Sequence, residues 1–452
     1  MNKHPTIIIH GSHQSEVFLH DEHGQRVLNA KGEPVRGGFG GLDQLVDMDP
    51  LVKKAIPRVL GSVLLRCDAG LSRCVRRQLE QADGWFDENG RHNRNFQVLR
   101  LHRMKGMDEA PTSLAELPGE VHDYVFRQVP MQKMAEQLGK ERMYYFAYDT
   151  MGNHGDVIDE LRQFIAEVLQ KHGAEKVNLL PISLGATVMN ALVEYYPEVQ
   201  RQLHNVVYIV PAFNGSMVVG DLLCGRLTIY DRALRGELLR KYAKGFGHRA
   251  VQALPERVIH RAIDAALEGV MHGLLGRATM LWALLPKEDY QTARARWLSD
   301  PALAELARQT DRYHQAQVNA VKNIRGMQAL GVRLYNINEY NIPMPRLGNS
   351  HTQHNADGVI DVFSTSMGAT SGYVDTPLPA EYLAKADPKY ISPDGIVDAS
   401  TGALPDTTFY FKNVHHDRTG KNEEIIRLAV TLAGTAEPVT VFDIGDGFAQ
   451  FA

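Results

Sequence analysis

The sequence predicts an α/β protein with a mostly parallel central sheet, flanked by helices and interrupted by an inserted helical cap. Two observations lead to this prediction. Short β-branched runs alternate along the chain with amphipathic segments of helical periodicity, the order expected of a parallel sheet. Between two such groups lies a long stretch with helical periodicity and no convincing strand signal. The 452 residues suffice for one large domain with an insertion, or for two domains.

The strands and helices before the insertion follow one another closely. Residues 6–10 are a β-branched run that ends at Gly11, typical of a buried strand leading into a tight turn. Residues 143–148 form a similar run, and residues 156–172 carry apolar side chains at helical spacing. A further strand, helix and strand are predicted at residues 176–181, 184–196 and 205–211. Because strands joined by intervening helices pair in parallel, these elements predict a parallel sheet.

The insertion is predicted from long helical stretches such as residues 254–275 and 300–327. Strand signals then resume, which indicates that the sheet is completed after the insertion. The later strands are predicted at residues 332–337, 358–363 and 408–411, and a helix at residues 422–432.

These signals divide the chain into three parts. The first part of the core is predicted at residues 1–221, the helical cap at residues 222–330, and the second part of the core at residues 331–452. Residues 12–140 give few signals beyond a Gly-rich loop at 36–41 and a polar, turn-like stretch at 84–95.

Composition and charge are those of an ordinary soluble globular protein, with 44% hydrophobic and 23% charged residues. The net charge of -4, with acids and bases interspersed, would not attract nucleic acid. Neither a leader peptide nor an apolar run of the roughly 18–20 residues that span a bilayer is expected. Three cysteines fit a reducing compartment, and Cys67 and Cys74 lack the further ligands of a metal site. We therefore expect a cytoplasmic protein without metal, cofactor or nucleic-acid partner.

Ser183 is the strongest candidate for a chemically active residue. It lies in Pro181-Ile182-Ser183-Leu184-Gly185, between a predicted strand and a predicted helix. A serine on such a sharp turn, a nucleophile elbow, projects its hydroxyl from the carboxyl edge of a sheet, and Gly185 lets helix and strand approach closely. Pro181 stands where the usual motif has a small residue, and a serine that merely caps a helix is the structural alternative.

Ser366 offers a more literal match to the same motif, because small residues flank it on both sides. The residues after it, 369–379, are rich in Gly, Pro, Thr and Ser and show no helical periodicity. The helix that an elbow requires is therefore missing, and we interpret Ser366 as a loop serine.

A serine nucleophile needs a histidine base and a carboxylate that orients it, and in this fold they follow in the order Ser, acid, His. Asp357 precedes the strand predicted at 358–363, so it can lie at the rim of the sheet; an ordinary Asp-Gly turn is the alternative. His415 and His416 follow the last predicted strand, and either could be the base. The backbone N–H groups of Ser12 and Leu184 occupy the places of two oxyanion donors, although the turn at Ser12 could be only a turn.

Several segments together resemble a family within the α/β-hydrolase superfamily. The similar segments occur in the order of the lipases and acyltransferases related to lecithin:cholesterol acyltransferase and lysosomal phospholipase. They are residues 7–15 with 21–24, 145–149, 177–185, 357–359 ahead of Ser364, and His416 ahead of 422–425. Residues 66–72 and 285–290 resemble uncharacterised bacterial members of that group. The resemblance implies Ser183 as nucleophile, Asp357 as acid, His416 as base, and Ser12 and Leu184 as oxyanion donors.

The sequence thus favours a serine esterase that acts through an acyl-enzyme on a small-molecule or lipid-like ester, with peripheral contact to a lipid surface as a further expectation. Apolar cap residues could form the acyl pocket, or could simply pack the cap: Met271, Leu274, Leu275, Met280, Leu281 and Trp282. Two alternatives stay open. Pro181 would suit a hydrolase-fold protein that has lost activity and only binds a ligand, and an acyltransferase would use the same three side chains.

Overall fold

The centre of the molecule is a six-stranded sheet in the order β12–β7–β6–β5–β1–β4, and every neighbouring pair is parallel. The computed structural model describes residues 4–29, 31–38, 48–80, 85–104, 110–129, 132–227, 254–345, 353–445 and 447–452. The six strands are β1 Thr6–Ile9, β4 Met143–Phe146, β5 Val177–Pro181, β6 Leu203–Ile209, β7 Arg333–Tyr340 and β12 Thr408–Lys412. The predicted parallel sheet is confirmed.

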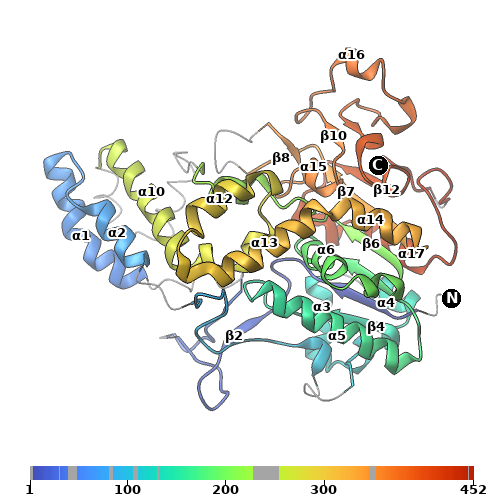
Figure 1. Ribbon diagram of the computed structural model, residues 1–452, viewed down its shortest axis with the longest axis horizontal. Coiled ribbons are helices and arrows are strands. Elements are labelled where there is room, and N and C mark those ends of the chain that lie inside the picture. Colours follow the sequence, from blue (N-terminus) through green and yellow to red (C-terminus); the bar gives the residue numbers. More distant parts are fainter. Residues whose placement is uncertain are drawn as a thin grey trace.

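Helices cover both faces of this sheet (Figure 1). Because its strands are buried on both sides, most are nearly continuous apolar runs, although β7 also buries Asn336, Asn338 and Glu339. Along β1, Ile7 and Ile9 pack into one core and Ile8 into the other. The first face carries α5 His154–His172, α6 Gly185–Tyr195, α13 Ala304–Val318 and α14 Ala320–Ala329. The second face carries α3 Gly119–Gln128, α4 Gln132–Leu138 and α17 Glu423–Gly434.

The cap is helical where the structure describes it, and residues 228–253 of the predicted insertion lie outside the described residues. The described helices of the predicted insertion are α10 Glu256–Gly273, α11 Thr279–Ala283, α12 Tyr290–Trp297, α13 and α14, and α7 Met217–Leu223 crosses its predicted start. Two helices from the N-terminal part of the chain, α1 (Met48–Leu65) and α2 (Leu71–Glu80), extend away from the sheet beside α10 (Figure 1). The domain boundaries that the sequence predicts at residues 221 and 330 remain a proposal. No helix in the described ranges is long and apolar enough to cross a membrane.

Some expected elements differ from the observed ones. The prediction of a strand at 358–363 is wrong: the short strand β9 (Asn355–Ala356) ends before this segment, and a turn then leads into the helix α15 (Val362–Thr365). The Asp361 carboxylate accepts a hydrogen bond from the Ser364 N–H (2.9 Å) and so starts that helix. The helix predicted at 300–327 is two helices, α13 and α14.

The segment from residue 12 to 140, which has few sequence signals, contains α1 to α4 and a short antiparallel pair, β2 (Val17–Leu19) with β3 (Phe96–Val98). Residues 39–41 of the expected Gly-rich loop, and Gly84 of the polar stretch, lie outside the described residues. Further short elements near the C-terminal half are β8 Ile342–Pro343, β10 Thr370–Ser371, β11 Val397–Asp398 and α16 Ala380–Leu383.

Candidate active site

Ser183 lies on a strained turn between β5 and α6. Its φ of 51° is in the left-handed region, which a residue with a side chain adopts only where its surroundings impose it. The turn is fixed from both neighbouring strands, since the Ile182 N–H donates to the Ile9 carbonyl (2.9 Å) and the Ser183 N–H to the Ile209 carbonyl (3.0 Å). A Cβ at Gly185 would lie 2.3 Å from the Ile9 carbonyl oxygen, so only glycine allows α6 to start this close to β1.

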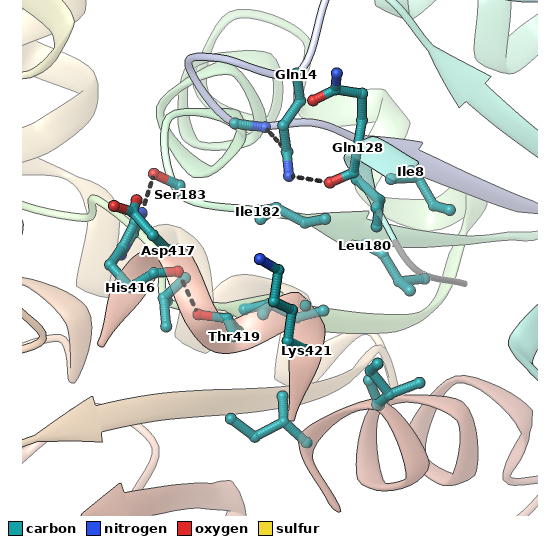
Figure 2. A pocket seen from close by; sticks show the side chains of 18 of the residues that line it. Ile8, Gln14, Gln128, Leu180, Ile182, Ser183, His416, Asp417, Thr419 and Lys421 are labelled. Carbon is teal, nitrogen blue, oxygen red and sulfur yellow. Dashed lines mark hydrogen bonds between the residues drawn. The ribbon is translucent and has the colours of Figure 1, made fainter. Parts of the chain in front are cut away.

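His416 and Asp357 lie next to this serine. His416 Nε2 is 3.0 Å from Ser183 Oγ, a contact visible in Figure 2, and His416 Nδ1 is 2.7 Å from Asp357 Oδ2. A carboxylate can only accept, so Nδ1 carries the proton and Nε2 is free to accept one from Ser183. The three side chains come from the elbow, the turn after β9, and the start of the 3-10 helix η12 (His416–Lys421) after β12. They form one continuous hydrogen-bonded series.

Asp357 is held from several sides and is fully buried. Its Oδ1 accepts hydrogen bonds from the N–H groups of Val359 (2.9 Å) and Ile360 (2.7 Å), and its carbonyl accepts from the His416 N–H (2.8 Å). Gly358 follows with a φ of 91°. Asp357 thus forms the Asp-Gly turn that was its structural alternative and contacts the imidazole with its second oxygen.

The protonation of His416 is set by two opposing effects. Burial alone would lower the pKa of this imidazole, but the charge and hydrogen bond of Asp357 raise it, and the net shift in the pKa is upward from 6.5. A more basic imidazole accepts a serine proton more readily in the transition state, provided that the pH is high enough to leave it neutral beforehand.

Both residues expected to supply oxyanion donors are close to Ser183 along or across the chain. Leu184 directly follows it, and Ser12 follows Gly11, where an added Cβ would lie 3.2 Å from the Cβ of Ser183. The turn at Gly11 is braced by Gln14, whose Oε1 accepts from the Gly11 N–H (2.7 Å) and whose Nε2 donates to the Gln128 carbonyl (3.1 Å) (Figure 2). No sequence signal indicates the role of Gln14, because a glutamine three residues after a glycine is common.

His10 also holds this turn and was not expected to. Its Nε2 accepts from the Tyr148 N–H (3.2 Å), so its Nδ1 carries the proton that is donated to the Gly11 carbonyl (2.6 Å). The ring is fully buried and stacks on Tyr148 at 4.2 Å. Burial lowers the pKa of His10 to about 4, so the ring stays neutral and keeps this arrangement over the neutral pH range.

A cavity of about 280 Å³ opens beside Ser183 and His416. Its apolar wall comes from the sheet, from the end of α3, from α4 and from α17: Ile8, Leu180, Ile182, Ile209, Val210, Val129, Met134, Ile425, Ile426 and Ala429. Two cations, Arg127 and Lys421, also line it, and Figure 2 shows the Lys421 side chain extending toward Ile182. The pocket therefore lies between the sheet and the helix α17.

The cap residues expected to form an acyl pocket do not line this cavity. Four of them are buried in a cluster with Trp85, Leu223 and Trp297, here called the cap cluster: Met271, Leu274, Leu281 and Trp282. Leu275 packs against the cap cluster, and Met280 belongs to the core on the α5 and α6 face of the sheet. Of the two roles that the sequence left open for these side chains, ordinary packing of the cap is the one observed.

The competing candidates lie elsewhere. Ser366 is fully buried at the end of α15, where its hydroxyl bonds the Val362 carbonyl and accepts from the Ala369 N–H (2.9 Å). His415 caps η12, since its Nδ1 accepts from the Asp417 N–H (3.2 Å). Neither contacts Ser183. Within the described ranges, no group of three or more His, Cys, Asp or Glu side chains could hold a metal ion.

No family model and no curated protein matches the chain. Among solved structures, phospholipase PlaB from Legionella pneumophila is 13% identical with a TM-score of 0.27, covering 55% of this chain and 42% of its own. The Tle4–Tli4 complex is 11% identical with a TM-score of 0.37, covering 95% and 97%. MGS-M2, an α/β hydrolase from a Medee basin deep-sea metagenome library, is 12% identical with a TM-score of 0.26, covering 68% and 85%. Likenesses this low carry no argument about activity, and the fold assignment rests on the sheet and the elbow.

Proposed function

We propose that the protein is a serine ester hydrolase that acts through a covalent acyl-enzyme on Ser183. The observation that carries the proposal is the hydrogen-bonded series from Ser183 through His416 to Asp357, on a strained strand-to-helix turn beside an apolar pocket. A serine that only capped a helix would need neither the positive φ nor a buried imidazole–carboxylate pair.

In the proposed reaction, Ser183 Oγ attacks the ester carbonyl while its proton passes to His416 Nε2. The carbonyl oxygen becomes an oxyanion, which the N–H groups of Ser12 and Leu184 stabilise. His416 then gives the proton to the leaving alcohol, and the acyl group remains on Ser183. Water, activated by the same imidazole, releases the carboxylic acid in a second round. Asp357 holds the imidazole in the required tautomer and stabilises its cation.

The pocket supports an apolar acyl group as the part of the substrate next to Ser183. Its walls include aliphatic side chains from β1, β5 and α17, which would contact a hydrocarbon chain, beside polar side chains such as Gln14, Arg127 and Lys421. The resemblance of scattered segments to the lipases and acyltransferases related to lecithin:cholesterol acyltransferase agrees with a lipid-like ester. The same three residues would also serve an acyltransferase, in which an alcohol replaces water.

Labelling by a fluorophosphonate probe, followed by intact mass, tests the proposal directly. We expect one adduct on the wild-type protein, no adduct on Ser183→Ala, and an undiminished adduct on Ser366→Ala. A second matched pair tests the base, because His416→Ala should lose labelling and His415→Ala should keep it. An unlabelled wild-type protein would contradict the proposal and favour the binding-protein alternative. Hydrolysis of p-nitrophenyl esters of increasing acyl length would then define the substrate.

A further inference from the structure

A second carboxyl group, that of Glu339 on β7, lies buried beside the proposed active site. Its side chain is fully buried. Its Oε1 is 2.8 Å from the Thr419 hydroxyl oxygen, and its Oε2 has no hydrogen-bond partner among the described residues. An ionised carboxylate in such a place would leave a buried charge with a single contact, which is costly.

Thr419 connects this carboxyl group to the histidine loop. The same hydroxyl oxygen is 2.7 Å from the main-chain carbonyl oxygen of His416. A hydroxyl has one proton to donate, and the His416 carbonyl can only accept. If Thr419 donates to His416, the contact between Thr419 and Glu339 must contain a proton from Glu339. Proton counting therefore favours the acid form of Glu339.

Asp357 makes a useful comparison because it is equally buried. Its carboxylate accepts from two backbone N–H groups and from the imidazole of His416, so its charge is compensated by three donors. Among the described residues, Glu339 has only the Thr419 hydroxyl within hydrogen-bond distance. Burial first, and the nearby negative charge of Asp357 second, raise the pKa of Glu339 to about 8. Two neighbouring carboxyl groups whose environments differ in this way divide the roles of anion and acid between them.

We infer that Glu339 is a neutral carboxylic acid at neutral pH and a positioning residue of the active site. Its proton is donated to Thr419, whose own proton is donated to the His416 carbonyl, and this relay fixes the first turn of η12. The negative charge beside the imidazole then stays on Asp357, where it directs the Nδ1 proton. The protonation state is independent of the proposed function, whereas its catalytic consequence rests on that function.

The groups that face Glu339 come from two further elements. Asp357 lies on the turn after β9, and His416, Asp417 and Thr419 lie on η12. Asp357 and Asp417 favour the protonated form of Glu339, while a protonated His416 and the Thr419 hydroxyl favour the ionised form. A variant that changes only Glu339 leaves all of these groups in place.

The pH dependence of stability tests the protonation state without using activity. In the folded protein Glu339 would keep its proton up to about pH 8, whereas in the unfolded chain it would lose it near 4.5. The folded state then binds one more proton between these pH values, so wild-type stability falls with rising pH relative to a variant that cannot ionise. The melting temperature of Glu339→Gln minus that of the wild type should therefore increase from pH 5 to pH 8. A difference that is constant or decreases over this range would overturn the inference.

The esterase activity of variants tests the hydrogen-bond relay from Glu339 through Thr419 to the His416 carbonyl. The side-chain amide that Glu339→Gln introduces can still donate to Thr419, but a leucine cannot, and it leaves Thr419 with one partner. We expect Glu339→Leu to lower kcat/KM by about tenfold more than Glu339→Gln, as expected for one lost buried hydrogen bond. Thr419→Val should lower kcat/KM by about the same factor as Glu339→Leu. Equal activities of the glutamine and leucine variants would contradict the positioning role, while the melting experiment would still decide the protonation state. Absent labelling of Ser183 in the wild type would instead contradict the proposed function.

Discussion

The cap cluster and the region beside Ser183 both gather apolar side chains, but they differ in the space that these side chains leave. In the cap cluster, large side chains such as Trp282 and Trp297 fill the space between helices, and they are almost completely buried. Beside Ser183, aliphatic residues of β5 and α17 leave a cavity of about 280 Å³. The sequence showed apolar residues at regular spacing in both. An apolar pattern thus predicts burial, but whether space remains depends on how far apart distant elements are held.

The largest expected effect is the loss of kcat in Asp357→Asn, which tests whether catalysis takes place beside the pocket. Asp357→Asn keeps the size of the side chain but offers an N–H to His416 Nδ1, which leaves the imidazole with its proton on Nε2, unable to accept one from Ser183. We expect kcat for a p-nitrophenyl ester to fall by about 10⁴-fold. Circular dichroism should show an unchanged fold. A loss of less than about tenfold would mean that this carboxylate does not orient a catalytic base.

The next effect concerns the cap cluster. Trp282 is buried and its Nε1 donates to the Gly276 carbonyl (2.8 Å), so Trp282→Ala should create a cavity and lower the free energy of unfolding by about 3–5 kcal/mol. Denaturant unfolding measures this loss. The preference of the folded protein for ester chain length should not change, because Trp282 does not line the pocket.

A matched variant on the pocket side completes this test. Ile426 is half-buried and lines the cavity, so Ile426→Ala should cost little stability, about 1 kcal/mol or less, and should alter the chain-length preference instead. The reverse pattern, with chain length changed by Trp282→Ala and not by Ile426→Ala, would restore the cap as the acyl site and remove the distinction between the two regions.

Much of the fold and the positions of the proposed catalytic residues could be predicted from the sequence, because each depends on a local signal. Ser183 and His416 each follow a strand that the sequence predicts, whereas Asp357 was placed by a strand at 358–363 that does not form and follows the short strand β9 instead. Their chain order then limits the choice. The short strand β9 was missed, since pairing of Asn355 and Ala356 with β8 fixes it and no apolar run marks it.

The pocket and the supporting residues could not be predicted, because they depend on contacts between distant segments. Gln14 meets Gln128, and Glu339 meets Thr419, across 114 and 80 residues. The strand predicted at 332–337 ends before Glu339; extended to the observed bounds of β7, it would have contained a buried acid, which is rarely placed in such a strand without a partner. Its partner, however, is visible only in three dimensions.

A smaller effect tests the shape of the pocket. Ala429 on α17 lines the cavity and is almost fully buried, so the ring that Ala429→Phe introduces should occupy part of it. Hydrolysis of long acyl esters should fall by about 10- to 200-fold relative to the acetyl ester, the range expected for steric discrimination in an apolar site. Measuring kcat/KM across a series of p-nitrophenyl esters gives this ratio. A uniform loss at all lengths would indicate that overpacking has disturbed α17 instead.

The smallest expected effect concerns Lys421, a cation that lines the pocket beside its aliphatic residues. Its ammonium group would attract an acyl chain that ends in a carboxylate, but Lys421 is exposed, so water and salt screen the attraction. Lys421→Met keeps the length of the stem and removes the charge. We expect kcat/KM for an ester with a terminal carboxylate to fall by about 3- to 5-fold at low salt, and by less at high salt. The neutral ester of equal length serves as the control and should be unaffected, whereas an equal loss for both esters would assign Lys421 a packing role along the pocket wall.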